Sequence, residues 1–240
     1  MVLALAFLLI AMMYAAVGQA GASGYLAAMG AAGLDPATMK VTALALNTLV
    51  AAISSLSFWR RGLLSWRAFY PFAILGFPFS MIGGAMDLPQ RLYYPVVGII
   101  LILSAMQMLR SLRRHKGVAD AYAPFLPALA CGAGIGLVSG ITGTGGGIFL
   151  APLILVFGWA SVRQTAAISA VYNLLNSAAA LIGSGARPQD FPDAMPAWLV
   201  AVAIGGILGA AIGGRVLPDK ALRVILAAIL MLSGTRMVVL

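Results

Sequence analysis

The sequence predicts an all-helical protein that crosses a membrane several times, and three observations support this prediction. Of its 240 residues, 62% are hydrophobic and 9% are charged, whereas about a quarter of the residues of an ordinary soluble domain are charged. The mean hydropathy is +1.02. The charged residues interrupt apolar runs of roughly 17–22 residues, the length that crosses a hydrocarbon core of about 30 Å. The composition therefore excludes a soluble globular domain.

Ten apolar segments, separated by polar or glycine-rich breaks, are expected to be helices. A helix rises about 1.5 Å per residue, so the second and seventh segments are too short to span and reach only about 20 Å. In chain order the ten segments are 2–17, 22–34, 41–58, 68–86, 92–109, 123–142, 147–158, 165–182, 197–214 and 221–239.

The chain repeats its own pattern. The glycine-rich breaks 18–24 and 140–147 precede the two short segments, and Gly18, Gly21 and Gly24 lie 122 positions before Gly140, Gly143 and Gly146. Asn47 lies 126 positions before Asn173, and Leu88-Pro89 lies 129 positions before Leu217-Pro218. We predict two copies of one unit, an N-terminal repeat 1–115 and a C-terminal repeat 121–240. Each copy has a broken helix pair, 2–34 or 123–158, followed by three transmembrane helices.

The basic residues favour inverted copies. If each broken pair forms a V that returns to the face it enters, one face holds 11 basic residues: Arg60, Arg61, Arg67, Arg110, Arg113, Arg114, Lys116, Arg163, Arg215, Lys220 and Arg223. The other face then holds four: Lys40, Arg91, Arg187 and Arg236. If each pair crossed once instead, the split would be 9 to 6. Positive charge prefers the cytoplasm, so we expect inverted-topology repeats with both termini extracytoplasmic.

Broken helices at membrane depth point to a transporter that holds its substrate between the breaks. The free N–H groups of each new helix carry partial positive charge, and glycine lets an anion approach them. The candidate binding residues of the second break are Thr142, Gly143, Thr144, Gly145, Gly146 and Gly147. Those of the first break are Gln19, Gly21 and Ser23. Close helix packing is the alternative reason for these glycines.

Asparagines within apolar runs complete the candidate site. Asn47, Asn173 and Asn176 are buried amides by position, and Ser169 precedes Asn173 by one helical turn. A buried amide must be hydrogen-bonded. These side chains either bind the substrate or clamp the broken helices by bonding their free backbone groups, and the sequence leaves both roles open.

Glycines four residues apart form two ladders, which are typical of close helix contacts. One is Gly132, Gly136 and Gly140, and the other is Gly205, Gly209 and Gly213; Gly76, Ser80 and Gly84 repeat the second in the first half. Packing is the expected role, and a homo-oligomer formed through these faces is a further expectation.

Several functions are excluded by what the sequence lacks. The six acidic residues are all aspartates in loops or at segment ends, and the one histidine, His115, lies in a polar loop, so a buried proton relay is not expected. The single cysteine, Cys131, excludes an intrachain disulfide framework and a cysteine-clustered metal site. The basic residues are scattered over loops, which disfavours nucleic acid as a partner. No strand precedes the glycine run, as a phosphate-binding loop would require. An enzyme is therefore not expected.

The motif Gly140-x-x-Gly143-x-Gly145-Gly146-Gly147 is followed by Pro152, Gly158 and Ala167-Ile-Ser169, and it resembles the TauE/SafE family of sulfite or organosulfonate exporters. The terminal run from Gly205 to Leu232 is also similar to that family. The first break departs from the pattern, because it lacks the triple glycine and has Met29-Gly30 where a proline is expected. Ile168-Ser169 stands in place of the family's Thr-Ser pair.

The resemblance implies transport of small sulfur-containing anions, such as sulfite or sulfoacetate, across the bacterial inner membrane, with no bound cofactor. The leading hypothesis is a secondary transporter whose two helix N-termini bind the anion near the midplane while Thr144, Asn173 and Asn47 orient it. Its partners are the small anionic substrate and the lipid bilayer. A passive anion channel with the same site is the alternative.

Overall fold

The computed structural model describes residues 2–16, 18–111, 123–212 and 219–239. Over these ranges the chain is helical and contains no strand, which confirms the predicted fold class. Each predicted segment corresponds, in order, to one α-helix: α1 Val2–Ala16, α2 Ala22–Ala31, α3 Pro36–Arg60, α4 Trp66–Ala85, α5 Gln90–Ser111, α6 Phe125–Thr142, α7 Gly147–Phe157, α8 Val162–Gly183, α9 Met195–Ile212 and α10 Asp219–Val239. The predicted boundary between the repeats, His115, Gly213 and the Leu217-Pro218 pair lie outside the described residues.

Capping residues explain where the two central helices start. Helix α3 begins five residues before the predicted segment, because Asp35 accepts a hydrogen bond from the Thr38 N–H (3.0 Å) and Pro36 occupies the first turn. Helix α8 begins three residues early, because Ser161 and Gln164 form a reciprocal capping box. Both caps add a turn of helix before the apolar run.

The lengths of the helices fit a multi-pass membrane protein. Within the described residues, four helices are long and apolar enough to cross a membrane: Pro36–Arg60, Trp66–Ala85, Phe125–Thr142 and Arg163–Gly183. Shorter apolar helices accompany them, among them the 15-residue α1 and the 11-residue α7. At about 1.5 Å per residue, α7 reaches about halfway across, as predicted for a broken helix.

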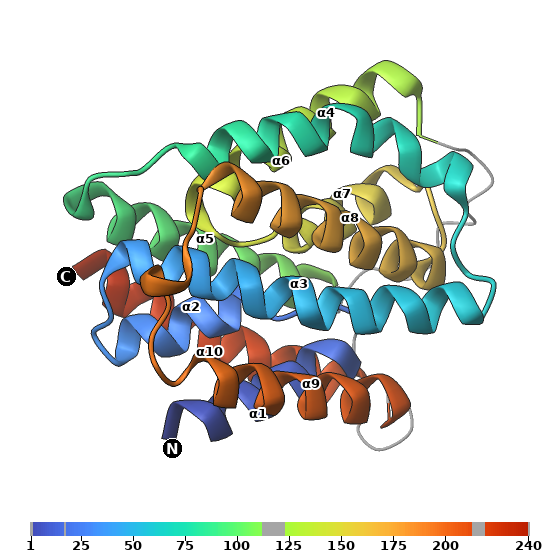
Figure 1. Ribbon diagram of the computed structural model, residues 1–240. Coiled ribbons are helices and arrows are strands. Elements are labelled where there is room, and N and C mark those ends of the chain that lie inside the picture. Colours follow the sequence, from blue (N-terminus) through green and yellow to red (C-terminus); the bar gives the residue numbers. More distant parts are fainter. Residues whose placement is uncertain (1, 17, 112–122, 213–218, 240) are drawn as a thin grey trace.

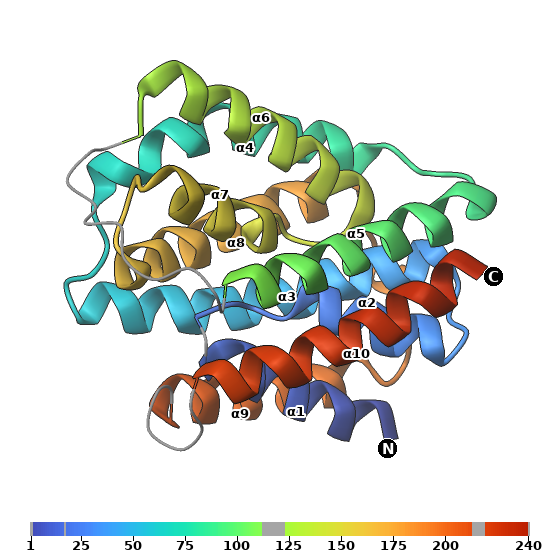
Figure 2. The same ribbon diagram turned by 180° about the vertical axis from the view of Figure 1, so that it is seen from behind.

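The central helices α3 and α8 pack against each other, and the remaining helices surround them in matching pairs (Figures 1 and 2). Helix α4 packs against α8 and α6, and α9 packs against α3 and α1. Helices α5 and α10 also form a pair. If the first five helices are exchanged for the last five, this set of contacts is unchanged.

Corresponding helices of the two halves run in opposite directions. In Figure 1, α3 runs away from the end of the molecule where both termini lie, whereas α8 runs back toward it. Helix α1 starts at that same end and α2 returns to it, whereas α6 starts at the opposite end and α7 returns there. Each broken pair therefore starts and finishes at the same end of the molecule.

The glycine ladders serve packing within the chain. A Cβ at Gly132, Gly136 or Gly140 on α6 would collide with backbone carbonyl oxygens of α4, at Phe72, Gly76 and Ser80 respectively. A Cβ at Gly205 or Gly209 on α9 would likewise collide with backbone carbonyl oxygens of α1. In the part of the chain that the structure describes, these glycine faces are therefore occupied by other helices of the same chain.

Candidate functional site

Two connections cross the interior of the protein, each between a first helix and the half-helix that follows it. Gly18 and Gly21 have φ of 77° and 96°, and Gly143 and Gly146 have φ of 80° and 83°, a backbone conformation that favours glycine. Gly21 and Gly146 precede the first residues of α2 and α7. The structure thus pairs the two breaks at an offset of 125 positions, three more than the spacing of glycines in the sequence suggests.

Two asparagines cap the half-helices. The N-caps Gly21 and Gly146 have no side chain with which to bond the free N–H groups of the first turn. Instead, the Ala22 N–H donates to Asn47 Oδ1 (2.9 Å), and the Gly147 N–H donates to Asn173 Oδ1 (2.8 Å). Both asparagines lie on the central helices and are buried. Of the two roles that the sequence left open, this conformation displays the clamp.

Asn47 also joins the two halves of the chain. Its Nδ2 donates a hydrogen bond of 2.7 Å to Ser177 Oγ on α8. A Cβ at Gly145 would lie 2.8 Å from Asn173 Oδ1 and 2.9 Å from Ser177 Oγ, and would also collide with Asn47 Nδ2. Glycine at this position therefore lets the second break run directly against the amides. We call Asn47, Asn173, Ser177 and the segment 145–147 the central cluster.

Two further candidates lie on α8 beside the central cluster with unused hydrogen-bonding capacity. Asn176 is fully buried, and neither its Oδ1 nor its Nδ2 has a partner; the same holds for Ser169 Oγ. A Cβ on Gly146 would lie 3.2 Å from Asn176 Nδ2, so this amide faces the start of α7. An unpaired buried amide costs about 1–3 kcal/mol per group. These groups are free to bind a ligand.

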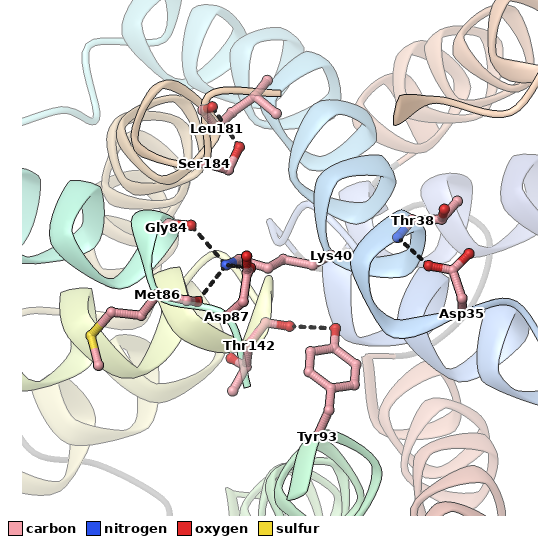
Figure 3. Close-up of polar contacts among 10 residues, drawn as sticks. All are labelled: Asp35, Thr38, Lys40, Gly84, Met86, Asp87, Tyr93, Thr142, Leu181 and Ser184. Carbon is pink, nitrogen blue, oxygen red and sulfur yellow. Dashed lines mark hydrogen bonds and ion pairs between the residues drawn. The ribbon is translucent and has the colours of Figure 1, made fainter. Parts of the chain in front are cut away.

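The remaining candidates are engaged locally. Thr142 and Thr144 are buried and share a hydrogen bond between hydroxyls (3.1 Å), and Tyr93 OH donates to the Thr142 carbonyl (3.0 Å; Figure 3). Gly143 ends α6. In the first break, Ser23 Oγ and Tyr14 OH form a hydrogen bond of 2.9 Å. Gln19 is half-buried and Gly21 is the N-cap of α2.

Sequence reasoning missed two residues of this region. Ser177 lies four residues after Asn173, which places both on one face of a helix, and that spacing was the available signal. Lys40 was assigned to a loop, yet it is only 3% exposed within α3. The Asp35-Pro36 pair, an N-terminal cap signal, would have placed Lys40 inside the helix.

Comparison with known proteins gives one consistent result. The family model described as "Sulfite exporter TauE/SafE" matches residues 3–237. A curated protein of Sinorhizobium fredii, named "Probable membrane transporter protein y4hK", is 54% identical over 238 residues, which cover 98% of this chain and 96% of that protein. No solved structure matches the chain. The family model spans almost all of the ten helices, and the protein belongs to the sulfite exporter TauE/SafE family of membrane transporters.

Proposed function

We propose that this protein is a secondary transporter, an exporter, of a small sulfur-containing anion such as sulfite or an organosulfonate. One observation carries the proposal. The half-helices α2 and α7 both begin in the interior, and Asn47 and Asn173, on the two helices that meet at the centre, hold their first N–H groups. Two positive helix ends directed at one buried region form an anion site, in the arrangement found in transporters with broken helices.

The anion binds near the midplane, beside the unpaired groups of α8. Asn176 Nδ2 and the Ser169 hydroxyl are donors without a partner at hydrogen-bond geometry, although the Tyr172 hydroxyl lies beside the Asn176 amide, and the helix N-termini supply partial positive charge. Asn47 and Asn173 hold the half-helices in position around the anion. Gly145, Gly146 and Gly147 keep the backbone of the second break within reach. The mechanism uses no cofactor.

Alternating access follows from inverted repeats. The antiparallel course of corresponding helices and the matched pairs of contacts support repeats 1–115 and 121–240 that rock against each other around the central cluster. The face that carries the termini is extracytoplasmic in the bacterial inner membrane, because the opposite face collects most of the basic residues. Any proton moves on the substrate itself, as hydrogensulfite, for the central cluster holds no carboxylate or histidine.

Flux measured in proteoliposomes tests the transporter. Sulfite, sulfate, sulfoacetate and thiosulfate are compared with and without a pH gradient. We expect saturable, selective flux of one sulfur anion and trans-stimulation by the same anion on the far side. Passive, unsaturated flux without trans-stimulation would indicate a channel instead, and no flux of any of the four would remove the proposed substrate class.

Asn176→Leu tests the site. The side chains have similar volumes, so the variant is expected to insert and fold, while flux falls about tenfold or more with the loss of the amide donors. Ser55→Ala is the matched control, because Ser55 Oγ is also buried and unpartnered but lies two turns beyond Asn47 on α3. Equal flux in both variants would show that Asn176 does not contact the anion.

A further inference from the structure

Lys40 places a buried positive charge near the end of the molecule that carries the termini. Its ammonium nitrogen donates to the Gly84 and Met86 carbonyl oxygens, at 2.7 Å each, and to Asp87 Oδ1 at 3.2 Å (Figure 3). The side chain of Lys40 is 3% exposed, whereas that of Asp87 is 87% exposed. Among the residues that the structure describes, Asp87 is the one acidic side chain paired with this buried ammonium. Because the Asp87 carboxylate is exposed to water, it can move away without desolvation of its own charge.

Lys40 lies on the same helix as Asn47 of the central cluster. It precedes Asn47 by seven residues on α3, which is about two turns or 10 Å along one face of the helix. The second break follows the same face: a Cβ on Gly143 would lie 3.2 Å from the Cα and carbonyl oxygen of Lys40, and Gly145 lies against the Asn47 amide. The segment 143–145 thus runs from Lys40 to the central cluster.

The opposite half has no equivalent lysine. Gly18 occupies the place in the first break that Gly143 occupies in the second, and a Cβ on Gly18 would lie 2.8 Å from Ala166 Cβ on α8. Ala166 follows Lys40 by 126 positions, the same spacing that separates the two capping asparagines. A buried charge therefore lies beside the second break, toward the end of the molecule that carries the termini. The corresponding position beside the first break, toward the opposite end, is the apolar Ala166.

We propose that Lys40 is a second anion-binding station, at the end of the pathway on the face that carries the termini, where the transported oxyanion replaces the carboxylate of Asp87. This inference rests on the proposed function. Three donors on one ammonium suit a sulfite or sulfonate group, whose oxygens can take the places of the Asp87 carboxylate and one of the carbonyls. The two faces then differ in their affinity for the anion.

The test measures KM from each face, in right-side-out and inside-out membrane vesicles, with sulfite as the probe. Lys40→Met is expected to raise KM about tenfold on the face that carries the termini, as loss of a charge-assisted hydrogen bond does, and to leave KM on the opposite face unchanged. Lys40→Arg keeps the charge and is expected to retain most of the affinity on that face.

Asp87→Asn is expected to change KM in the opposite direction. Removing the competing carboxylate is expected to lower KM on the face that carries the termini by about twofold to fivefold, whereas a purely structural ion pair gives no gain. Asp35→Asn is the matched control, because it removes a negative charge at the same end while asparagine still caps α3. Unchanged KM on both faces in both the Lys40→Met and Asp87→Asn proteins would overturn the station and leave the transporter intact.

If the unaltered protein carries no flux, the same variants are titrated with sulfite by calorimetry in detergent. Binding that is weakened by Lys40→Met and strengthened by Asp87→Asn would still support the station. Binding that is absent, or equal in all variants, would overturn it.

Discussion

Replacing Asn47 separates a helix clamp from a substrate ligand. The change to alanine removes two buried hydrogen bonds, those that join Asn47 to the Ala22 N–H and to Ser177 Oγ. It leaves an unsatisfied N–H at the start of α2 and an unsatisfied hydroxyl on α8. At about 1–3 kcal/mol for each of the two groups left unpaired, we expect a loss of roughly 2–6 kcal/mol in the free energy of unfolding.

Two further variants provide comparisons for the effect of Asn47→Ala on stability and flux. Asn173→Ala removes the corresponding cap of α7 and should cost less, about 1–3 kcal/mol. Asn47→Asp is the isosteric partner: its carboxyl can still accept from the Ala22 N–H and a hydroxyl can bond its other oxygen, so the fold should survive. A negative charge about 4 Å from the anion, at an effective dielectric constant near 20, opposes binding by about 4 kcal/mol, so flux should be lost.

The assay pairs thermal unfolding in detergent with sulfite flux in proteoliposomes. Asn47→Ala should lower Tm and the maximal rate, because α2 loses its fixed position, while Asn47→Asp should lower flux with little change in Tm. The clamp would be refuted if Asn47→Ala kept the Tm of the unaltered protein and raised only KM. That pattern is expected of a residue that contacts the substrate and has no structural role.

The other predictions concern packing and capping. Gly140→Val should prevent α6 from packing on α4, because its side chain would occupy the place of the Ser80 carbonyl oxygen; the yield of folded protein after extraction measures this. Gly134→Val on the same helix, with nothing within 4 Å of its Cβ, should extract normally. Asp35→Ala should cost about 1 kcal/mol of stability, seen as a lower Tm. Partial burial raises the pKa of the Asp35 carboxyl, but hydrogen bonds from Thr38 and other backbone groups lower it by more. The stability that the ionised carboxyl contributes is therefore present above its ordinary pKa and is lost as the pH falls through the lowered pKa. A pH series of Tm measures this loss.

The sequence was sufficient to predict the helices and the two breaks, because apolar length and glycine placement are local signals. It also drew attention to Asn47 and Asn173, which cap the two half-helices. It could not choose their partners: Asn47 bonds a serine 130 positions away, and only the packing of α3 on α8 brings the two together. The burial of Lys40 has the same origin, because the carbonyls that bond it belong to the end of α4.

The register between the two breaks shows a different limit. Glycines recur every third residue in both breaks, at 18, 21 and 24 and at 140, 143 and 146, so a shift of three positions still matches two of the three glycines. The sequence comparison chose an offset of 122, and the backbone conformation gives 125. Backbone torsion decides the pairing, because it distinguishes a glycine that needs positive φ from one, such as Gly24, that lies inside a helix.

The two halves share the clamp but differ in the residues beside it, and under the proposed function this difference favours an anion site on the α8 side. The residues 126 positions before Asn176 and Ser177 are Val50 and Ala51, both buried and apolar. Unpaired amide groups facing a half-helix thus occur on α8 and not at the matching place on α3. Such groups lower stability, so an apolar replacement at Asn176 removes a cost. Asn176→Leu should therefore raise Tm while it reduces flux, the reverse of the effect of Asn47→Ala on stability. A fall in Tm in Asn176→Leu would show that its amide is satisfied in the folded protein and would contradict the choice of Asn176 as an anion contact.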